Sequence, residues 1–260
     1  MKKEKKMDKV IYERMHNNLL KLDLCHLETR IDGLLEDSSN SKKSIVEIIE
    51  GILDEEITFR ESRIANTRIK LARFPFIKTI DQFEFTFQPN LDKERVLSLF
   101  SLNFIEEKGN VILIGPPGVG KTHIAISLGI SACQHGYTTY WTTFQELIET
   151  LRIAHKQNRL KRKLQTFSKP KLLIIDEMGY LPLGIEESNF FFQLVSSRYL
   201  KGSIVLTSNR NFSEWVDIFP QESIAAAILD RLCENSKIIK IIGESYRIKS
   251  KKKLGLFEKT

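Results

Sequence analysis

The chain has 260 residues, 42% of them hydrophobic, which suits one large or two modest domains with a buried core. No apolar run reaches the length of a membrane span, and the lysine-rich start leads into polar sequence, which argues against a membrane or secreted protein. The three cysteines form no C-x-x-C pair, which argues against a zinc site or a disulfide framework and predicts a cytoplasmic protein. The net charge of +7 favours a polyanionic partner.

Residues 1–75 predict a small helical domain. The first nine residues are rich in lysine and are expected to be disordered or frayed. Apolar side chains then recur at steps of three and four over residues 10–34 and again within residues 45–71, which predicts amphipathic helices. The pair Phe74-Pro75 ends the last of these, because the residue before a proline avoids helical backbone angles. We expect this domain to contact a partner protein or DNA.

Residues 76–250 predict an α/β domain. The alternation of phenylalanine with polar residues over 80–87 indicates a short strand or a hook, and residues 91–105 indicate a helix. Further along, apolar strands alternate with helices, with the strands expected at 111–114, 138–141, 171–177, 203–209 and 238–242. Strands that are apolar throughout predict a parallel sheet covered by helices on both faces. Residues 251–260 form a basic tail.

A glycine-rich segment follows the first of these strands and precedes a helix. It reads G-P-P-G-V-G-K-T and matches the phosphate-binding pattern G-x-x-x-x-G-K-[ST] in the strand–turn–helix context that the pattern requires. Backbone N–H groups of such a loop converge on phosphate oxygens at a helix N-terminus. We therefore expect nucleoside triphosphate binding by Gly115, Pro116, Pro117, Gly118, Val119, Gly120, Lys121, Thr122 and His123. The alternative is a glycine-rich turn without a ligand.

Polar residues end two of the predicted strands. Asp176 is placed to hold Mg²⁺ together with the hydroxyl of Thr122, and Glu177 to orient or deprotonate an attacking water. Asn209 is a candidate for contacting that water or the γ-phosphate, with an Asx turn as the alternative. The guanine-binding motif N-K-x-D is absent from the sequence, so we expect ATP rather than GTP, and hydrolysis rather than transfer. For the adjacent acids Asp176 and Glu177, the alternative interpretation is a solvated turn.

The combined motifs resemble those of AAA+ ATPases, and more narrowly the IstB-like transposition helper ATPases, relatives of the DnaC-type helicase loaders. The resemblance covers about residues 20–249 and rests on G-P-P-G-V-G-K-T, L-L-I-I-D-E-M-G-Y-L-P-L, T-S-N-R-N-F-S-E-W, A-I-L-D-R-L and G-E-S-Y-R. It implies an AAA+ P-loop domain after a helical N-terminal domain, with oligomerisation on DNA that depends on ATP. Since the chain stops soon after G-E-S-Y-R, we expect no C-terminal lid domain.

Two arginines acquire candidate roles from this resemblance. Arg231 matches the arginine finger, which completes the ATP site of the neighbouring subunit, although a surface salt bridge is the alternative. Arg247 is a weaker candidate for a second arginine that senses ATP, because its usual setting is the lid that this chain is expected to lack.

A basic stretch lies between the second and third predicted strands. Residues 152–171 contain eight lysines or arginines and no acid, whereas a solvated helix face usually mixes both signs. This pattern predicts salt-sensitive DNA binding with little sequence preference, and a solvated helix face is the alternative. In initiator-type AAA+ proteins, which the chain resembles, this element lines the path of the nucleic acid. The candidate contacts are Arg152, Lys156, Arg159, Lys161, Arg162 and Lys163.

These expectations together describe a cytoplasmic ATPase that assembles on duplex DNA with Mg²⁺ and ATP and recruits or activates a transposase. The first alternative keeps the same ATPase but loads a replicative helicase. The second is a DNA scaffold gated by nucleotide, with negligible hydrolysis. The basic tail is predicted equally well to add DNA contacts or to be a flexible end.

Overall fold

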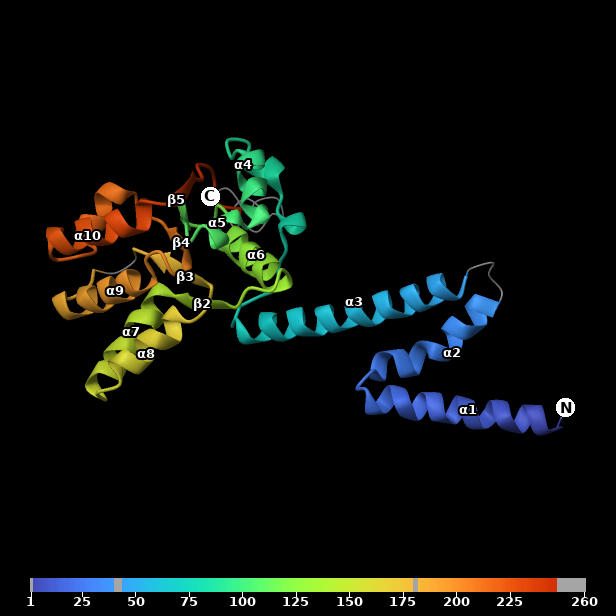
Figure 1. The fold of residues 1–260 in the computed structure, drawn as a ribbon. Helices are drawn as coiled ribbons and strands as arrows, with labels where there is room; N and C mark the ends of the chain where they lie inside the picture. Colours follow the sequence, from blue (N-terminus) through green and yellow to red (C-terminus); the bar gives the residue numbers. More distant parts are fainter. Residues whose placement is uncertain (1, 40–43, 180–181, 247–260) are drawn as a thin grey trace, which may run out of the picture. The chain divides into compact units, whose positions relative to one another are not determined.

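The chain divides into two units, Met1–Ile64 and Ala65–Thr260, in a computed structural model that describes residues 2–39, 44–179 and 182–246. The first unit is helical, consisting of α1 (Lys2–Lys21), α2 (Cys25–Ser39) and most of α3 (Ile45–Leu71) (Figure 1). The prediction of fraying before residue 10 differs from the structure, because α1 already begins at Lys2. The apolar repeat over residues 10–34 is split at Asp23, whose φ of 56° is left-handed and interrupts the helix.

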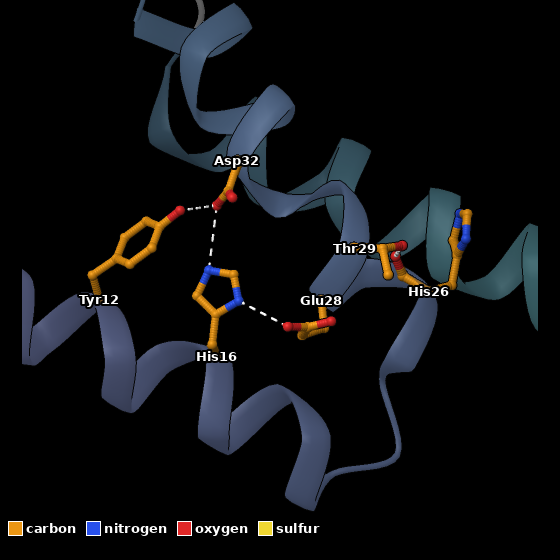
Figure 2. Close-up of polar contacts among 6 residues, drawn as sticks. All are labelled: Tyr12, His16, His26, Glu28, Thr29 and Asp32. Atoms are coloured by element: carbon orange, nitrogen blue, oxygen red, sulfur yellow. Dashed lines mark hydrogen bonds and ion pairs between the residues drawn. The ribbon is translucent and has the colours of Figure 1, made fainter.

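Polar contacts join the first two helices of the helical unit (Figure 2). The ring of His16 on α1 lies between two carboxylates of α2, with Nδ1 3.1 Å from Glu28 Oε1 and Nε2 3.3 Å from Asp32 Oδ1. Tyr12 donates a hydrogen bond to the same oxygen of Asp32. A neutral imidazole has a single N–H, so only the protonated ring donates to both acids. These contacts raise the pKa of His16 above its ordinary value, with the hydrogen bond to Glu28 as the largest cause.

The second unit contains a parallel sheet of five strands in the order β2-β3-β4-β1-β5. The strands are β1 (Asn110–Ile114), β2 (Thr139–Thr143), β3 (Leu172–Met178), β4 (Ser203–Ser208) and β5 (Ser236–Lys240). All four neighbouring pairs are parallel, so the five strands end at one edge of the sheet. This confirms the α/β fold with a parallel sheet.

Helices cover both faces of the sheet (Figure 1). One apolar core forms beneath α7 (Phe144–Lys156), α8 (Leu160–Ser168), α9 (Ile185–Arg198) and α10 (Glu222–Cys233). The other lies beneath α4 (Lys93–Ser98), α5 (Asn103–Glu106) and α6 (Lys121–Gln134). Side chains of β1 alternate between them, since Ile112 packs in the first core and Val111 and Leu113 in the second.

Three local features go beyond the sequence predictions or differ from them. Residues 80–87 form two 3₁₀ turns, Ile80–Gln82 and Phe85–Phe87, so of the two predicted alternatives the hook fits and the strand does not. The helix expected over 91–105 is broken by a left-handed Leu102, with φ of 59°. The basic stretch contains a helix of its own, α8, which was not predicted because its polar residues obscure the apolar spacing of Leu160, Leu164 and Phe167.

Candidate functional site: a nucleotide pocket and a basic groove

The loop between β1 and α6 adopts a backbone that requires glycine at two positions. Gly118 has φ of 82° and Gly120 has φ of 103°, values that other residues rarely adopt. A Cβ on Gly118 would lie 2.2 Å from Ser245 Oγ, and one on Gly120 would lie 2.5 Å from the ring of Phe83. The loop therefore approaches its neighbours too closely for side chains at these two positions, and it leads into the N-terminus of α6, which favours an anion.

Lys121 is buried and folded against this loop. Its Nζ donates to the carbonyl oxygens of Gly115 at 2.6 Å and of Pro116 at 2.9 Å. These bonds hold a positive charge at the loop, where phosphate groups are expected. The residues of the loop fit a triphosphate, since they combine a cation, glycines with left-handed backbone and a helix N-terminus.

Asp176 lies at the end of β3, close to the first turn of α6. Its side chain is buried, and Oδ1 accepts hydrogen bonds from Thr122 Oγ1 at 3.0 Å and from Thr207 Oγ1 at 2.5 Å. Burial raises the pKa of the Asp176 carboxyl, while the two hydroxyls and Lys121 oppose that rise. A buried carboxylate beside a hydroxyl supplies the hard oxygen ligands that Mg²⁺ prefers, so these residues fit the metal.

Glu177 projects differently from its neighbour because the strand is irregular at this point. The register of β3 against β4 shifts between Ile175 and Met178, and Glu177 adopts a left-handed φ of 63°. Its N–H donates to Thr207 Oγ1 at 2.9 Å, and its exposed side chain lines the pocket beside the loop. Such a backbone costs about 1–3 kcal/mol and tends to occur at functional sites. Asp176 is thereby buried while Glu177 remains open to a ligand.

Asn209 follows β4 and lines the same pocket. Its Oδ1 is buried and has no hydrogen-bond partner among the residues that the structure describes. An unpaired buried amide oxygen is costly, which favours a donor such as a water molecule at this place. Thr207, two residues earlier, contacts both acids. It opens the run T-S-N-R-N-F-S-E-W, but no role was predicted for it, and its hydroxyl at the end of a strand is the signal that could have suggested one.

The pocket has a volume of about 520 Å³ and extends from the loop to a wall of mostly aromatic side chains. The strap, residues 76–88, supplies one side of this wall, and Tyr246 supplies the other. The ring of Phe87 lies 4.7 Å from that of Tyr246, whose N–H donates to Gly118 O at 2.9 Å. The wall is formed by Phe76, Phe83, Phe87, Gln88 and Tyr246, which gives an aromatic surface suited to a purine ring.

His123 lines the pocket but also holds the strap in place. Its Nε2 lies 2.9 Å from Thr79 O, and burial lowers its pKa, so the neutral ring donates this hydrogen bond. One turn later, Ser127 Oγ donates to Lys78 O at 3.0 Å. The first half of α6 therefore fixes the strap through two carbonyl oxygens.

The two arginines of interest lie elsewhere or outside the described residues. Arg231 on α10 does not line the pocket of its own chain. Its Nη1 donates to Ala227 O at 2.9 Å, and its guanidinium lies 5.0 Å from the centre of the Phe192 ring. A residue that serves a neighbouring subunit is expected to lie outside its own pocket. Arg247 and the basic tail lie outside the described residues.

The predicted DNA contacts lie on α7, α8 and the turn between them, and the structure separates them into two sets. A groove of about 500 Å³ runs between the two helices and is lined by Thr150, Ile153, Ala154 and Gln157 on one side and Arg159, Arg162, Lys163 and Thr166 on the other. Both sets follow the spacing i, i+3, i+4, i+7, which places each on one helix face. The charged residues that line this groove, Arg159, Arg162 and Lys163, are all basic.

The remaining three candidates do not line this groove. Arg152 forms an ion pair with Glu149 on its own helix. Lys156 and Lys161 are exposed and project elsewhere. The six basic residues, grouped together in the sequence, are thus not equivalent in the structure.

The chain was compared with known families and structures. Residues 17–254 match the family described as IstB-like ATP binding protein. An ATP-binding protein of insertion sequence IS21 from Pseudomonas aeruginosa is 44% identical over 241 residues, which cover 93% of this chain and 91% of that protein. A relative from insertion sequence IS5376 of Geobacillus stearothermophilus is 42% identical, covering 92% of this chain and 96% of the relative.

A solved structure of the AMPPCP-bound replication initiator DnaA from Aquifex aeolicus has a TM-score of 0.56 at 20% identity, covering 72% of this chain and 57% of that one. At this identity the likeness concerns the fold, and it agrees with an AAA+ P-loop domain. The described helices contain no segment long and apolar enough to cross a membrane. The family match, the identities and the phosphate-binding loop agree, and the chain belongs to the IstB-like ATP-binding proteins of insertion sequences.

Proposed function

We propose that this protein hydrolyses ATP with Mg²⁺ and that this activity controls its assembly on DNA for transposition. The observation that carries the proposal is the chain of hydrogen bonds from Thr122 through Asp176 to Thr207, with Glu177 open in the same pocket. This arrangement separates two tasks between adjacent acids. The buried carboxylate suits a metal ion, and the exposed one suits a water molecule.

The residues of the pocket have distinct roles in this proposal. The loop and Lys121 bind the triphosphate, and Thr122 and Asp176 would hold Mg²⁺, which would supply positive charge beside the phosphates. Glu177 accepts the proton of the attacking water or orients it, and Asn209 supplies the amide oxygen that accepts a further hydrogen bond from it. The strap and Tyr246 enclose the base.

Hydrolysis is tested with Glu177→Gln, which keeps the shape of the side chain and removes its basicity. Removal of a general base typically lowers the rate by about 10²–10⁴, whereas ATP affinity should change little. Glu94→Gln is the matched control, since Glu94 is exposed on α4 and does not line the pocket. Turnover that is low in the parent protein and unchanged in Glu177→Gln would instead support the DNA scaffold with negligible hydrolysis.

DNA is the proposed partner of the groove between α7 and α8. Arg159, Arg162 and Lys163 provide three positive charges on one wall without a lining acid, which supports contact with backbone phosphates. The other wall, formed by Thr150, Ile153, Ala154 and Gln157, presents no acid that would repel a phosphate. Because the lining residues include no base-reading motif, we expect binding to duplex DNA with little dependence on sequence.

Oligomerisation is proposed to bring Arg231 of one subunit to the ATP of the next. Sedimentation with duplex DNA, with and without ATP, tests this for the parent protein and Arg231→Ala. We expect a large species that requires both ATP and DNA and is lost in the variant. An assembly that is unaffected by Arg231→Ala would contradict the role of this arginine in the neighbouring site.

The helical unit, α1 to α3, is proposed to bind the partner protein. The relatives belong to insertion sequences, which favours a transposase encoded alongside over a replicative helicase. Pull-down with each purified candidate distinguishes the two, with residues 65–260 as the control for dependence on the helical unit. Selective binding of a replicative helicase would favour the loader alternative.

A further inference from the structure

Arg198, the last residue of α9, is buried with only 1% of its surface exposed. The two Nη groups of its guanidinium make five hydrogen-bond contacts, all of them to backbone carbonyl oxygens, whereas the buried Nε has no partner among the described residues. Nη1 contacts the carbonyls of Phe167 (2.8 Å), Ser168 (3.2 Å) and Pro170 (3.0 Å), and Nη2 contacts those of Lys171 (3.2 Å) and Ser203 (2.7 Å). Burial lowers the pKa of Arg198 to about 10, so the group remains protonated at neutral pH.

These five carbonyls belong to three separate pieces of the fold. Phe167 and Ser168 lie in the last turn of α8, where carbonyl oxygens lack partners within the helix and the helix dipole is negative. Pro170 and Lys171 lead directly into β3, and Ser203 is the first residue of β4. A single guanidinium therefore connects the end of the basic helix to the starts of two central strands.

Two further features support this connection. The hydroxyls of Ser168 on α8 and Ser197 on α9 lie 2.6 Å apart, which adds a hydrogen bond between the same helices. Gly202 lies so close that a Cβ there would be 2.8 Å from Arg198 Nη2. The absence of a side chain at Gly202 thus allows the guanidinium to reach the carbonyls of Lys171 and Ser203.

The two strands whose starts contact Arg198 carry the nucleotide site at their other ends. β3 runs from its start beside Arg198 to Asp176 and Glu177, and β4 runs from Ser203 to Thr207 and, just after it, Asn209. α8 carries Arg162 and Lys163, which form the basic wall of the groove. A lysine could not replace the arginine, since its ammonium is a point donor whereas the two Nη groups present four N–H groups in a planar fork.

We propose that Arg198 is a positioning residue that fixes the basic wall of the groove to the strands of the nucleotide site, and thereby couples DNA in the groove to ATP hydrolysis. This inference rests on the proposed DNA contact at the groove. Without Arg198, α8 remains attached by its apolar side chains, but the cations of α8 no longer hold one position. ATP binding persists, because no atom of Arg198 lines the nucleotide pocket.

The test compares Arg198→Lys with the parent protein, measuring DNA affinity across a salt series, affinity for a fluorescent ATP analogue, and ATPase rate with and without DNA. We expect DNA affinity to fall about tenfold at 0.1 M salt, the effect of losing one phosphate contact. Nucleotide affinity should stay within about twofold, and the change in ATPase rate on adding DNA should disappear. A purely structural role would instead weaken nucleotide and DNA binding together.

Gly202→Ala is the second variant, because it displaces the guanidinium without changing any charge, and it should act in the same direction. The inference is overturned if both variants keep the parent's DNA affinity and response, or if both lose nucleotide binding in parallel with DNA binding. A variant with Arg159, Arg162 and Lys163 all changed to Gln separates the two ideas. If that variant binds DNA normally, the proposed groove itself is wrong; if it loses DNA binding while the Arg198 variants do not, only the role of Arg198 is wrong.

Discussion

The division of the basic residues into two sets of three permits a comparison at constant charge. One variant changes Arg159, Arg162 and Lys163 of the groove to Gln. Its control changes Arg152, Lys156 and Lys161 to Gln, so that each variant loses three positive charges from the segment 152–163. A difference in DNA binding between them then depends on position and not on net charge.

The expected magnitude follows from counterion release. Each phosphate neutralised on duplex DNA contributes about −0.9 to the slope of log K against log salt concentration. Loss of three contacts should make the slope less steep by about 2.7. The parent protein should therefore lose about 40-fold more affinity than the groove variant when salt rises from 50 to 200 mM. The control should keep a slope close to that of the parent.

Fluorescence anisotropy with a labelled duplex of random sequence, over at least four salt concentrations, measures these slopes. Nucleotide affinity of each variant, measured in parallel, verifies that the ATP site is intact. Equal loss of slope in both variants would refute the argument, because it would mean that DNA responds to the overall charge of the helix pair. An unchanged slope in both would place the DNA contact elsewhere on the protein.

Three further predictions concern the loop, the acids and the helical unit. Gly120→Ala should abolish ATP binding, measured by nucleotide titration, because the added Cβ clashes with Phe83 of the strap. Gly136 has φ of 91° but open space around it, so Gly136→Ala should cost only about 1 kcal/mol of stability, measured by thermal denaturation. Thr207→Val should leave ATP affinity nearly unchanged but reduce turnover, since loss of its hydrogen bonds to the adjacent acids costs about 1–3 kcal/mol; normal kcat would contradict this. His16 should titrate above its ordinary pKa of 6.5 by NMR, and Glu28→Gln should lower that pKa. The stabilisation from His16 is then complete below pH 6.5 and lost as pH rises through the raised pKa; an unchanged pKa in the variant would refute it.

Local pattern was sufficient to predict the framework of the α/β unit. An apolar strand, a glycine-rich turn and a small-residue helix are consecutive in the chain, so their order alone predicted the loop at Gly115–Thr122. The parallel sheet followed from the same logic, because a strand that is apolar throughout must be covered on both faces. The pair Asp176-Glu177 was recognisable because it ends such a strand.

Only the tertiary structure decided which distant residues meet these motifs. Thr207 contacts an acid 31 residues away, Arg198 binds carbonyls from three parts of the fold, and Tyr246 forms a wall of the pocket together with the strap. None of these contacts leaves a periodic signal in the sequence. The opposite roles of two adjacent acids depend on the left-handed backbone of Glu177, which composition does not indicate. Local order is encoded by neighbouring residues, whereas the geometry of the site is set by packing between residues far apart in the chain.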